Sequence, residues 1–322
     1  MTQLMLMTLS TGSMPLNILL LVGGIVLVLK SADWLTDGAV AMASRFGVSQ
    51  IVIGLTIVAM GTSMPELCVS LVSALKGTPD LAVGNVVGSN IFNTLLIVGC
   101  SALVAPLVVK PSTVRRDMLF ALLASAMLLV MCADGTVSRS DAALLLVAFA
   151  VFMTVTLRGS KDAGDDGGQA AAPTGMARAA LLIVCGLAGL VGGSNVFVDN
   201  ASYVAAQFGV SDAVIGLTIV AGGTSLPELA TSMVAARKGN SDIAIGNVIG
   251  SNVFNILMIL GVTGAVAPLH IQGITTVDLS TMGVSTVVLW LFARTKYTVA
   301  RWEGGVLVAL FAAYMWWLIA TV

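Results

Sequence analysis

Long apolar stretches separated by short polar intervals make up most of the chain. A membrane-spanning helix needs about 20 apolar residues, and ten stretches approach or exceed this length. They lie at residues 16–44, 49–75, 80–106, 116–133, 140–157, 179–206, 211–236, 242–268, 273–293 and 302–320. With 57% hydrophobic and 10% charged residues, the pattern predicts an all-α integral membrane protein with ten transmembrane helices. The net charge of −1 argues against a nucleic-acid-binding protein.

One interval is polar throughout. Residues 158–178, RGSKDAGDDGGQAAAPTGMAR, are rich in Gly, Ala and Asp and have no apolar periodicity, as expected of a flexible linker. We therefore divide the chain into a first five-helix unit at 1–157, a polar linker at 158–178 and a second five-helix unit at 179–322. The first 14 residues contain no basic segment, so we expect a short tail rather than a signal peptide.

The two five-helix units repeat the same sequence motifs. IGLTIVAMGTSMPE at 53–66 recurs as IGLTIVAGGTSLPE at 215–228, and GNVVGSNIFN at 84–93 recurs as GNVIGSNVFN at 246–255, in both cases 162 residues later. Because each unit has an odd number of spans, the second unit must enter the membrane from the opposite side. The sequence therefore predicts an inverted repeat, which is typical of secondary transporters.

Loop charges set the orientation of the whole chain, because cytoplasmic loops collect Lys and Arg. With both termini outside and the linker in the cytoplasm, only Lys76 and Arg139 fall in outside loops. The predicted cytoplasmic residues are Arg45, Lys110, Arg115, Arg116, Arg158, Lys161, Arg178, Arg237, Lys238, Arg294, Lys296 and Arg301. We expect this orientation in a prokaryotic inner membrane.

Each unit interrupts an apolar span with a proline that precedes a glutamate. Proline lacks the backbone donor of a helix, so Pro65 frees the carbonyl of Gly61 and perturbs the turn around Ala59. Such a break is tolerated within a membrane when it lines a polar cavity. The groups at the two breaks are all oxygens, which suit hard cations such as Ca²⁺ and Na⁺; they come from Thr62, Ser63 and Glu66, and from Thr224, Ser225 and Glu228.

The second motif places a polar stripe on one helix face in each unit, because Asn85, Ser89 and Asn93 follow one another at intervals of four residues. These groups can bind ions or form hydrogen bonds between helices. We favour ion binding for Ser89, Asn93, Ser251 and Asn255. For Asn85, Asn90, Asn247 and Asn252 we favour interhelical hydrogen bonds.

The other ionisable residues divide into functional and structural candidates. No basic residue lies near Glu66 or Glu228 in its own or the adjacent span, which favours a functional role. For Asp37 and its counterpart Asp199 we favour a structural role, since Lys30 and Asp33 can hold Asp37 in a charge network. His270 is expected to be a wetted residue at a span end. The cysteines are expected to be packing thiols, since none has metal-ligand spacing; they are Cys68, Cys100, Cys132 and Cys185.

The paired motifs GTSMPE with GNVVGSN and GTSLPE with GNVIGSN resemble those of the cation/calcium antiporter superfamily, close to prokaryotic sodium/calcium exchangers. The resemblance implies a core of the second, third, seventh and eighth helices, across which the first and sixth slide. It implies Ca²⁺ and Na⁺ as transported substrates, a lipid surrounding, no cofactor and no obligate protein partner. The implied cation ligands are Ala59 and Ala221 by their carbonyls, with Thr62, Ser63, Glu66, Ser89, Asn93, Thr224, Ser225, Glu228, Ser251 and Asn255.

Two carboxylates near the membrane midplane can be neutralised by one Ca²⁺ or by monovalent ions, so competition for one set of oxygens predicts obligatory exchange. The alternatives are a proton-coupled exchanger and an uncoupled cation channel. An enzyme is disfavoured because HExxH and GxSxG motifs are absent from the sequence. Potassium-dependent relatives have Asp where this chain has Asn255, so the resemblance implies potassium-independent exchange.

Overall fold

The computed structural model describes residues 12–162, 175–210, 219, 221–271 and 273–321. The first repeat contains α1 (Met14–Phe46), α2 (Gln50–Ile53), η1 (Gly54–Val58), α3 (Ala59–Thr62), α4 (Met64–Leu75), α5 (Pro79–Ile91), η2 (Phe92–Ile97), α6 (Val98–Val104), β1 (Leu107–Val108), η3 (Thr113–Asp117), α7 (Met118–Met131), η4 (Cys132–Asp134), β2 (Thr136–Val137) and α8 (Arg139–Asp162). The second contains α9 (Met176–Gln207), α11 (Ala221–Thr224), α12 (Leu226–Arg237), α13 (Ser241–Val253), η6 (Phe254–Ile259), α14 (Leu260–Val266), β3 (Leu269–His270), α15 (Thr276–Lys296), β4 (Thr298–Val299) and α16 (Arg301–Thr321).

The predicted membrane spans appear as helices in this structure. Within the described residues, eight helices are long and apolar enough to cross a membrane, and Gln50–Thr62 with Met64–Leu75 forms a further span bent by 46°. Of the remaining predicted span, 211–236, the part at 211–218 and 220 lies outside the described residues, as does 163–174 of the linker. The protein is therefore an all-α, multi-pass membrane protein of two inverted repeats with broken central helices.

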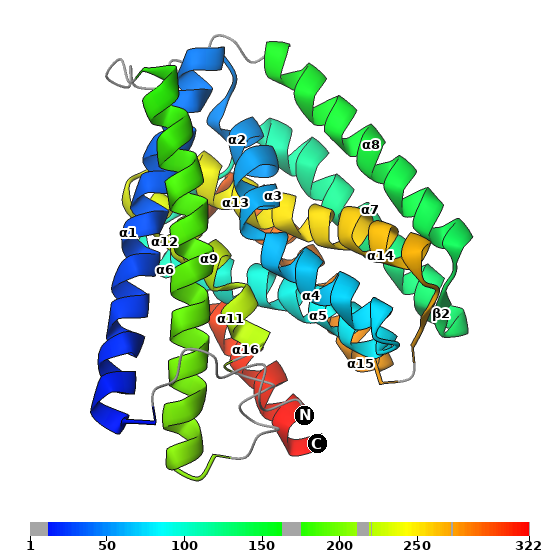
Figure 1. Cartoon of the computed structure of the whole chain (residues 1–322). Coiled ribbons are helices and arrows are strands. Elements are labelled where there is room, and N and C mark those ends of the chain that lie inside the picture. The colour runs from blue at the N-terminus through cyan, green and yellow to red at the C-terminus, as the bar shows by residue number, and fades with distance from the viewer. Residues whose placement is uncertain (1–11, 163–174, 211–218, 220, 272, 322) are drawn as a thin grey trace.

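The two longest helices, α1 and α9, lie side by side along one edge of the molecule (Figure 1). Glycines bring their backbones close together, as small residues do between membrane helices. A Cβ atom added at Gly186 would lie only 2.8 Å from the backbone nitrogen of Leu35, and one added at Gly24 would lie 3.0 Å from that of Phe197. The other long helices, among them α7, α8, α15 and α16, surround the bent core helices on the remaining sides.

The core helices are broken at the predicted positions. Ser63 separates α3 from α4 with φ −83° and ψ 9°, and Ser225 separates α11 from α12 with φ −90° and ψ 7°. Each proline then falls in the first turn of the following helix, where its missing N–H is not needed. The carbonyl of Ala59 keeps a backbone hydrogen bond, because the Ser63 amide donates to it at 3.0 Å.

Wider helical turns occur before the first break and after both breaks. The segments η1, η2 and η6 are π-helical, and η2 and η6 begin at equivalent residues, Phe92 and Phe254. Short π-helical turns inside α-helices occur often at functional sites. In both repeats the π-helical turn begins at the residue before the last asparagine of the second motif, Asn93 or Asn255.

Two short antiparallel ladders join the repeats. The first pairs Leu107 with Val299, and the second pairs Thr136 with His270. The ladders are equivalent under the 162-residue repeat, which relates β1 to β3 and β2 to β4. His270 is exposed, with Nδ1 3.2 Å from Thr136 Oγ1, as expected for a residue at a span end. All four cysteines are free.

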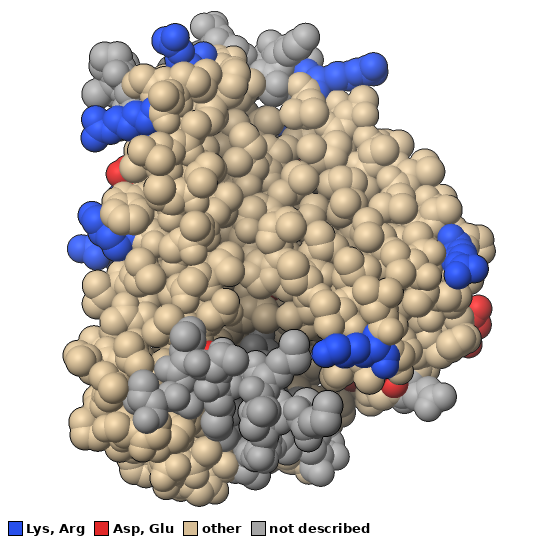
Figure 2. All heavy atoms as spheres, viewed as in Figure 1, with Lys and Arg blue, Asp and Glu red and all other residues tan. Residues whose placement is uncertain are grey.

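Charged side chains are few and lie toward the margins of the face in Figure 2.

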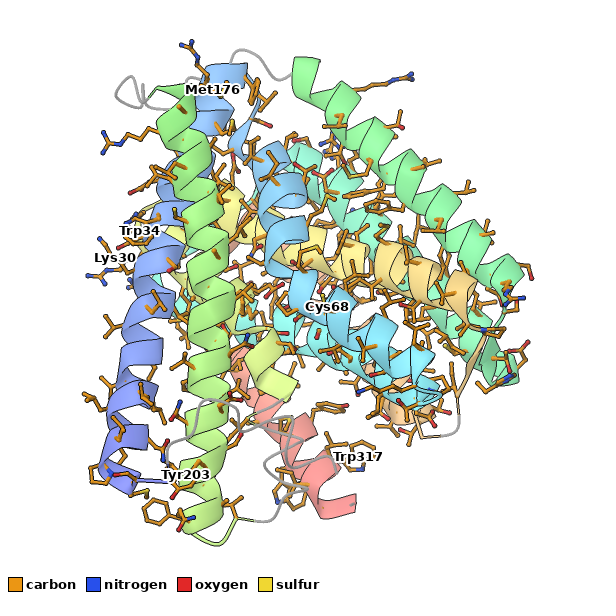
Figure 3. All side chains as sticks on the ribbon, in the orientation of Figure 1. Lys30, Trp34, Cys68, Met176, Tyr203 and Trp317 are labelled. Carbon is orange, nitrogen blue, oxygen red and sulfur yellow. The ribbon has the colours of Figure 1, made fainter. Side chains whose placement is uncertain are left out.

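The proposed pairing of Asp37 with Lys30 is wrong. Lys30 is exposed on the outer side of α1 (Figure 3), whereas the Nζ atom of Lys238 lies 2.8 Å from Asp37 and 3.0 Å from Asp33. Burial by itself lowers the pKa of Lys238, but the hydrogen bonds and charges of the two aspartates outweigh it and raise the pKa. The sequence could not reveal this partner, because it belongs to the other repeat.

Candidate ion-binding site

Two buried carboxylates are the central feature of the candidate site. Glu66 lies in the first turn of α4 and is 0% exposed, while Glu228 lies in the first turn of α12 and is 1% exposed. Both glutamates therefore lie just after a helix break, and in the first repeat the helices on either side of the break are bent by 46°. Among the described residues, neither glutamate forms an ion pair with Lys or Arg.

Each carboxylate accepts a hydrogen bond from the serine at the break of the other repeat. Ser63 Oγ donates to Glu228 Oε1 at 2.8 Å, and Ser225 Oγ donates to Glu66 Oε1 at 3.0 Å. Ser225 Oγ also lies 3.3 Å from Ser89 Oγ on α5. The breaks of the two repeats therefore face each other, and the two glutamates share one polar region.

Several buried polar atoms around the carboxylates have no hydrogen-bond partner in the described part of the chain. They are the second carboxylate oxygens of Glu66 and Glu228, Oδ1 of Asn93, and both amide atoms of Asn255. A buried polar atom without a partner costs free energy, and an uncompensated buried charge costs more. The arrangement therefore requires a cation, or protons, to offset the two carboxylates.

Helices α3 and α13 close another side of the region. The Thr62 hydroxyl lies 3.1 Å from Asn247 Oδ1, and two backbone carbonyls of its own span are also within hydrogen-bond distance. Because the hydroxyl has one proton, it donates to only one of these three acceptors at a time. Ser251 Oγ lies 3.5 Å from the carbonyl oxygen of Ala59. The backbones approach closely here, because a Cβ atom added at Gly250 would lie 2.6 Å from the Leu55 carbonyl oxygen.

Two asparagines hold the carboxylate helices in place. Asn85 donates to the backbone carbonyl of Glu66 at 3.1 Å and to Ser70 Oγ at 3.0 Å. Asn247 makes the equivalent contacts, to the Glu228 carbonyl at 3.3 Å and to Ser232 Oγ at 2.9 Å. The interpretation of these asparagines as interhelical hydrogen bonders fits the geometry. Sequence reasoning missed the two serines, although their 162-residue separation repeats the period of the motifs.

The remaining asparagines connect η2 with α13. Asn93 Nδ2 donates to Asn252 Oδ1 at 3.1 Å, and Asn252 Nδ2 donates to Thr94 Oγ1 at 2.8 Å. The expected interhelical bond is wrong for Asn90, which donates to the Val86 carbonyl in its own helix at 2.7 Å. Thr94 was not a predicted site residue, because its counterpart in the second repeat is isoleucine and the repeat therefore gave no signal.

The other predicted residues lie on the same elements. Asn255 is fully buried in η6, and Thr224 is half-buried immediately before the second break. Ala221 begins α11, and its side chain lies outside the described part of the structure. Within the described residues, no three His, Cys, Asp or Glu side chains cluster. The donors that this region offers are two carboxylates and neutral oxygens, a set that suits hard cations.

Comparison with known proteins gives a consistent result across the chain. The family described as "Sodium/calcium exchanger protein" matches residues 16–158 and 178–320. The chain is 39% identical over 309 residues to the putative antiporter CaxA of Alkalimonas amylolytica, covering 92% of this chain and 97% of the relative. It is 33% identical over 340 residues to the sodium/calcium exchanger MaX1 of Methanosarcina acetivorans, covering 93% of this chain and 97% of the relative.

The fold is also similar to that of a solved exchanger. A structure of the sodium-calcium exchanger NCX_Mj, soaked with zero Na⁺ and Ca²⁺, superposes with a TM-score of 0.84 at 32% identity. The match covers 95% of this chain and 100% of that one. With both repeats matched by the family and near full-length similarity to its members, the chain belongs to the sodium/calcium exchanger protein family.

Proposed function

We propose that this protein is a secondary active antiporter that exchanges Ca²⁺ for Na⁺ across the membrane. One observation carries the proposal: two fully buried carboxylates face each other across the repeats, and each accepts a hydrogen bond from the serine of the opposite repeat. Relatives named as sodium/calcium exchangers match this chain over nearly their whole length, and their names support the choice of ions.

The charge of the site explains why transport is coupled. Glu66 and Glu228 together carry two negative charges when ionised, which one Ca²⁺ balances and which Na⁺ ions also offset. An empty, doubly charged site is costly in a low-dielectric interior, so the loaded site crosses the barrier far more readily than the empty one. Because Ca²⁺ and Na⁺ compete for one set of oxygens, the two ions move in exchange.

The predicted ligands supply the rest of the coordination. Ca²⁺ takes six to eight oxygen ligands in flexible geometry. The two carboxylates are joined in our proposal by the Ala59 and Ala221 carbonyls and by the hydroxyl and amide oxygens of Thr62, Ser63, Ser89, Asn93, Thr224, Ser225, Ser251 and Asn255. The buried, unpartnered oxygens of Glu66, Glu228, Asn93 and Asn255 support this assignment.

Access alternates, in this proposal, as α1 and α9 move together across the core. The two helices pack closely on each other, and α9 touches both broken spans. A Cβ atom added at Gly61 would lie 2.6 Å from a Leu187 methyl carbon, and one added at Gly223 would contact Val198. Leu187 and Val198 both belong to α9, so a shift of this helix changes the cover over both breaks.

Exchange is proposed to be independent of potassium. The equivalent positions Asn93 and Asn255 are neutral, so the site has two carboxylates and no third to offset an additional K⁺. An uncompensated charge in a low-dielectric interior costs several kcal/mol. The protein is placed in the prokaryotic inner membrane in this proposal, with both termini outside and the linker in the cytoplasm, on the basis of its loop charges.

Isotope flux in proteoliposomes tests the function. Purified protein is reconstituted, and ⁴⁵Ca²⁺ uptake is measured with Na⁺, K⁺ and pH gradients imposed one at a time. We expect a Na⁺ gradient alone to drive uptake, including when choline replaces K⁺. Uptake driven by a pH gradient without Na⁺ would instead identify a proton-coupled exchanger. Flux that rises without saturation and needs no counter-ion would identify a channel.

A further inference from the structure

A cavity lies at an end of the helix bundle, and none of the predicted ion ligands lines it. Its volume is about 360 Å³, and it opens between the start of the span formed by η3 and α7 and the end of α15. Its walls come from two short stretches, Val114, Arg115 and Leu119 on one side and Trp290, Arg294 and Tyr297 on the other.

The cavity carries two positive charges and no negative one. Arg115 and Arg294 are the only ionisable side chains in its walls apart from the Tyr297 phenol. In the described part of the chain neither guanidinium forms an ion pair, whereas the adjacent Arg116 is bound to Asp117 at 2.8 Å. Two arginines that face one cavity repel each other, so an anion between them stabilises both.

Aromatic side chains hold the walls in position. The Arg294 guanidinium lies over the Trp290 ring, 5.0 Å from its centroid, in a cation–π contact. The indole N–H of Trp290 donates to the Val114 carbonyl at 3.2 Å and so ties α15 to η3. Tyr297 has a φ of 51°, the only positive φ at a described residue other than glycine. Such a conformation is disfavoured for residues with a Cβ, and here it ends α15 beside the cavity.

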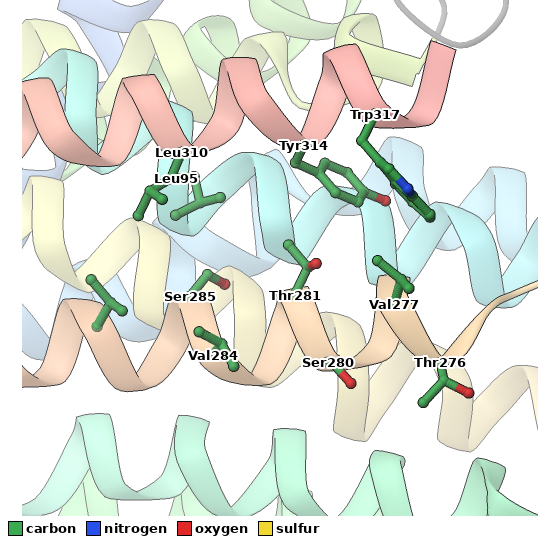
Figure 4. A pocket seen from close by; sticks show the side chains of 11 residues that line it. Leu95, Thr276, Val277, Ser280, Thr281, Val284, Ser285, Leu310, Tyr314 and Trp317 are labelled. Carbon is green, nitrogen blue, oxygen red and sulfur yellow. The ribbon is translucent and has the colours of Figure 1, made fainter. Parts of the chain in front are cut away.

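The inverted counterpart of this region lacks the charges. Val277 and Cys132 stand at the positions equivalent to Arg115 and Arg294. Figure 4 shows a pocket of about 480 Å³ that shares Thr276, Val277 and Thr281 with this counterpart region but lies between α15 and α16, and no charged side chain lines it. The fold therefore does not require arginine here, and the two guanidinium groups distinguish one membrane face from the other.

The depth of the two arginines identifies the kind of anion. Arg115 is in the first turn of the span Thr113–Asp134, and Arg294 is in the last turn of the span Thr276–Lys296. Lipid phosphates lie at such span ends, where Trp and Tyr are also enriched. Val114, Leu119 and the Trp290 ring provide an apolar floor next to the charges, which favours a lipid over a soluble anion.

We propose that this cavity binds the phosphate of an anionic phospholipid from the leaflet on the side of the 158–178 linker. The two guanidinium groups grip the phosphate oxygens, and the apolar floor receives the glycerol and the upper acyl chain. Basic pockets between membrane helices are known to recognise anionic lipid headgroups in this way.

Native mass spectrometry of the delipidated full-length protein tests the proposal. The protein is titrated with phosphatidylglycerol or with phosphatidylcholine of the same acyl chains, and the apparent affinity of the tightest site is measured. We expect phosphatidylglycerol to bind more tightly. Arg115→Gln and Arg294→Gln should each weaken it about fivefold, and the double variant about 25-fold. Binding of phosphatidylcholine should fall less, because its choline cation offsets the charge of its phosphate.

Three comparisons make the test decisive. Arg45→Gln removes an exposed arginine that is predicted to lie on the same side, and it should leave the tightest site unaffected. Arg294→Lys keeps the charge but loses the two-pronged contact, so we expect a loss smaller than for Arg294→Gln. Equal lipid affinity in the double variant and the wild type would overturn the proposal, as would full displacement of the lipid by millimolar inorganic phosphate. If the double variant fails to fold, the two single variants decide.

Discussion

The two repeats hold their asparagines differently. In the first repeat Asn90 donates to the Val86 carbonyl of its own helix, whereas the equivalent Asn252 donates across the interface to Thr94. The residue equivalent to Thr94 in the second repeat is Ile256, which offers no acceptor. Asn252 is thereby positioned to accept from Asn93, while the side chain of Asn255 has no hydrogen-bond partner among the described residues.

The carboxylates, by contrast, have equivalent hydrogen-bond partners in both repeats. Each accepts from the serine of the opposite repeat, at 2.8 Å and 3.0 Å. The inverted duplication therefore keeps the charged part of the site nearly symmetric, and one difference between threonine and isoleucine makes the neutral part asymmetric. This contrast suggests that the charges set whether an ion binds and that the amides tune which ion binds, a division that the following experiments can break or sharpen.

The largest expected difference between the two repeats is in the side of the membrane from which equivalent residues can be labelled. Thr78 and Asn240 are equivalent residues that precede α5 and α13. In a background without the native cysteines, we expect Thr78→Cys to react with a membrane-impermeant maleimide from outside. Asn240→Cys should react only after permeabilisation, as should Met176→Cys beside the linker. Labelling of Thr78→Cys and Asn240→Cys from the same side would contradict the inverted orientation.

Removal of either charge should come next. Glu66→Gln and Glu228→Gln should each reduce Ca²⁺ affinity by about 100-fold or more. Each substitution removes a carboxylate that is proposed to pair with the buried Ca²⁺, and losing one partner of a buried ion pair costs about 3–5 kcal/mol. Near symmetry predicts similar losses, measured as Ca²⁺-dependent uptake in proteoliposomes. Thermal unfolding in the absence of Ca²⁺ serves as the folding control. Exchange close to wild type in either variant would refute the assignment of the site.

A smaller loss is expected from the serines at the breaks. Ser63→Ala and Ser225→Ala each remove a hydrogen bond to a carboxylate, worth about 1.5–3 kcal/mol, so we expect Ca²⁺ affinity to fall about tenfold or more. Ser225→Ala should have the larger effect, because Ser225 also contacts Ser89. A larger effect of Ser63→Ala would show that the first repeat dominates binding.

The asparagine asymmetry can be tested directly. Thr94→Val removes the acceptor of Asn252 without changing the shape of the side chain, and we expect a loss of about 1–3 kcal/mol in the free energy of unfolding. Thr263→Val is the matched control, because its buried hydroxyl has no hydrogen-bond partner among the described residues and its loss should cost little. Equal destabilisation by both variants would show that the contact with Asn252 contributes nothing.

The smallest effect should come from the ion pairs of Lys238. Lys238→Gln should lower the free energy of unfolding by at most about 1 kcal/mol, since partly exposed ion pairs contribute little. The aspartates raise the pKa of Lys238 in the folded state, so its contribution is complete below the unfolded pKa and is lost only as pH rises through the folded value. The difference from wild type should therefore stay constant between pH 6 and 9, and a steep change there would point to another titrating group.

Much of the architecture could be predicted because it depends on local sequence patterns. Hydropathy located the spans, the 162-residue period exposed the duplication, and Pro65 and Pro227 located the breaks. Contacts that depend on three-dimensional packing were not accessible. Lys238 lies about 200 residues from Asp37 along the chain, and a residue that breaks the repeat, such as Thr94, leaves no periodic signal.

The candidate site was predictable to the same extent. The two glutamates and their serines could be singled out because each pair recurs 162 residues apart beside a proline in an apolar span. The exchange of hydrogen bonds between the repeats could not, because it depends on how the two breaks face each other. The π-helical turns at Phe92 and Phe254 were also missed, since a single wide turn barely alters the apolar periodicity.

The lengths of α1 and α9 have a mechanical consequence. With 33 and 32 residues these helices extend to about 50 Å at 1.5 Å per residue, well beyond the roughly 30 Å hydrocarbon thickness of a bilayer. A helix longer than the bilayer is accommodated by tilting, and the cost of tilting changes with membrane thickness. In the proposed transport cycle α1 and α9 move together, so we expect acyl chain length to change the exchange rate more than the ion affinity.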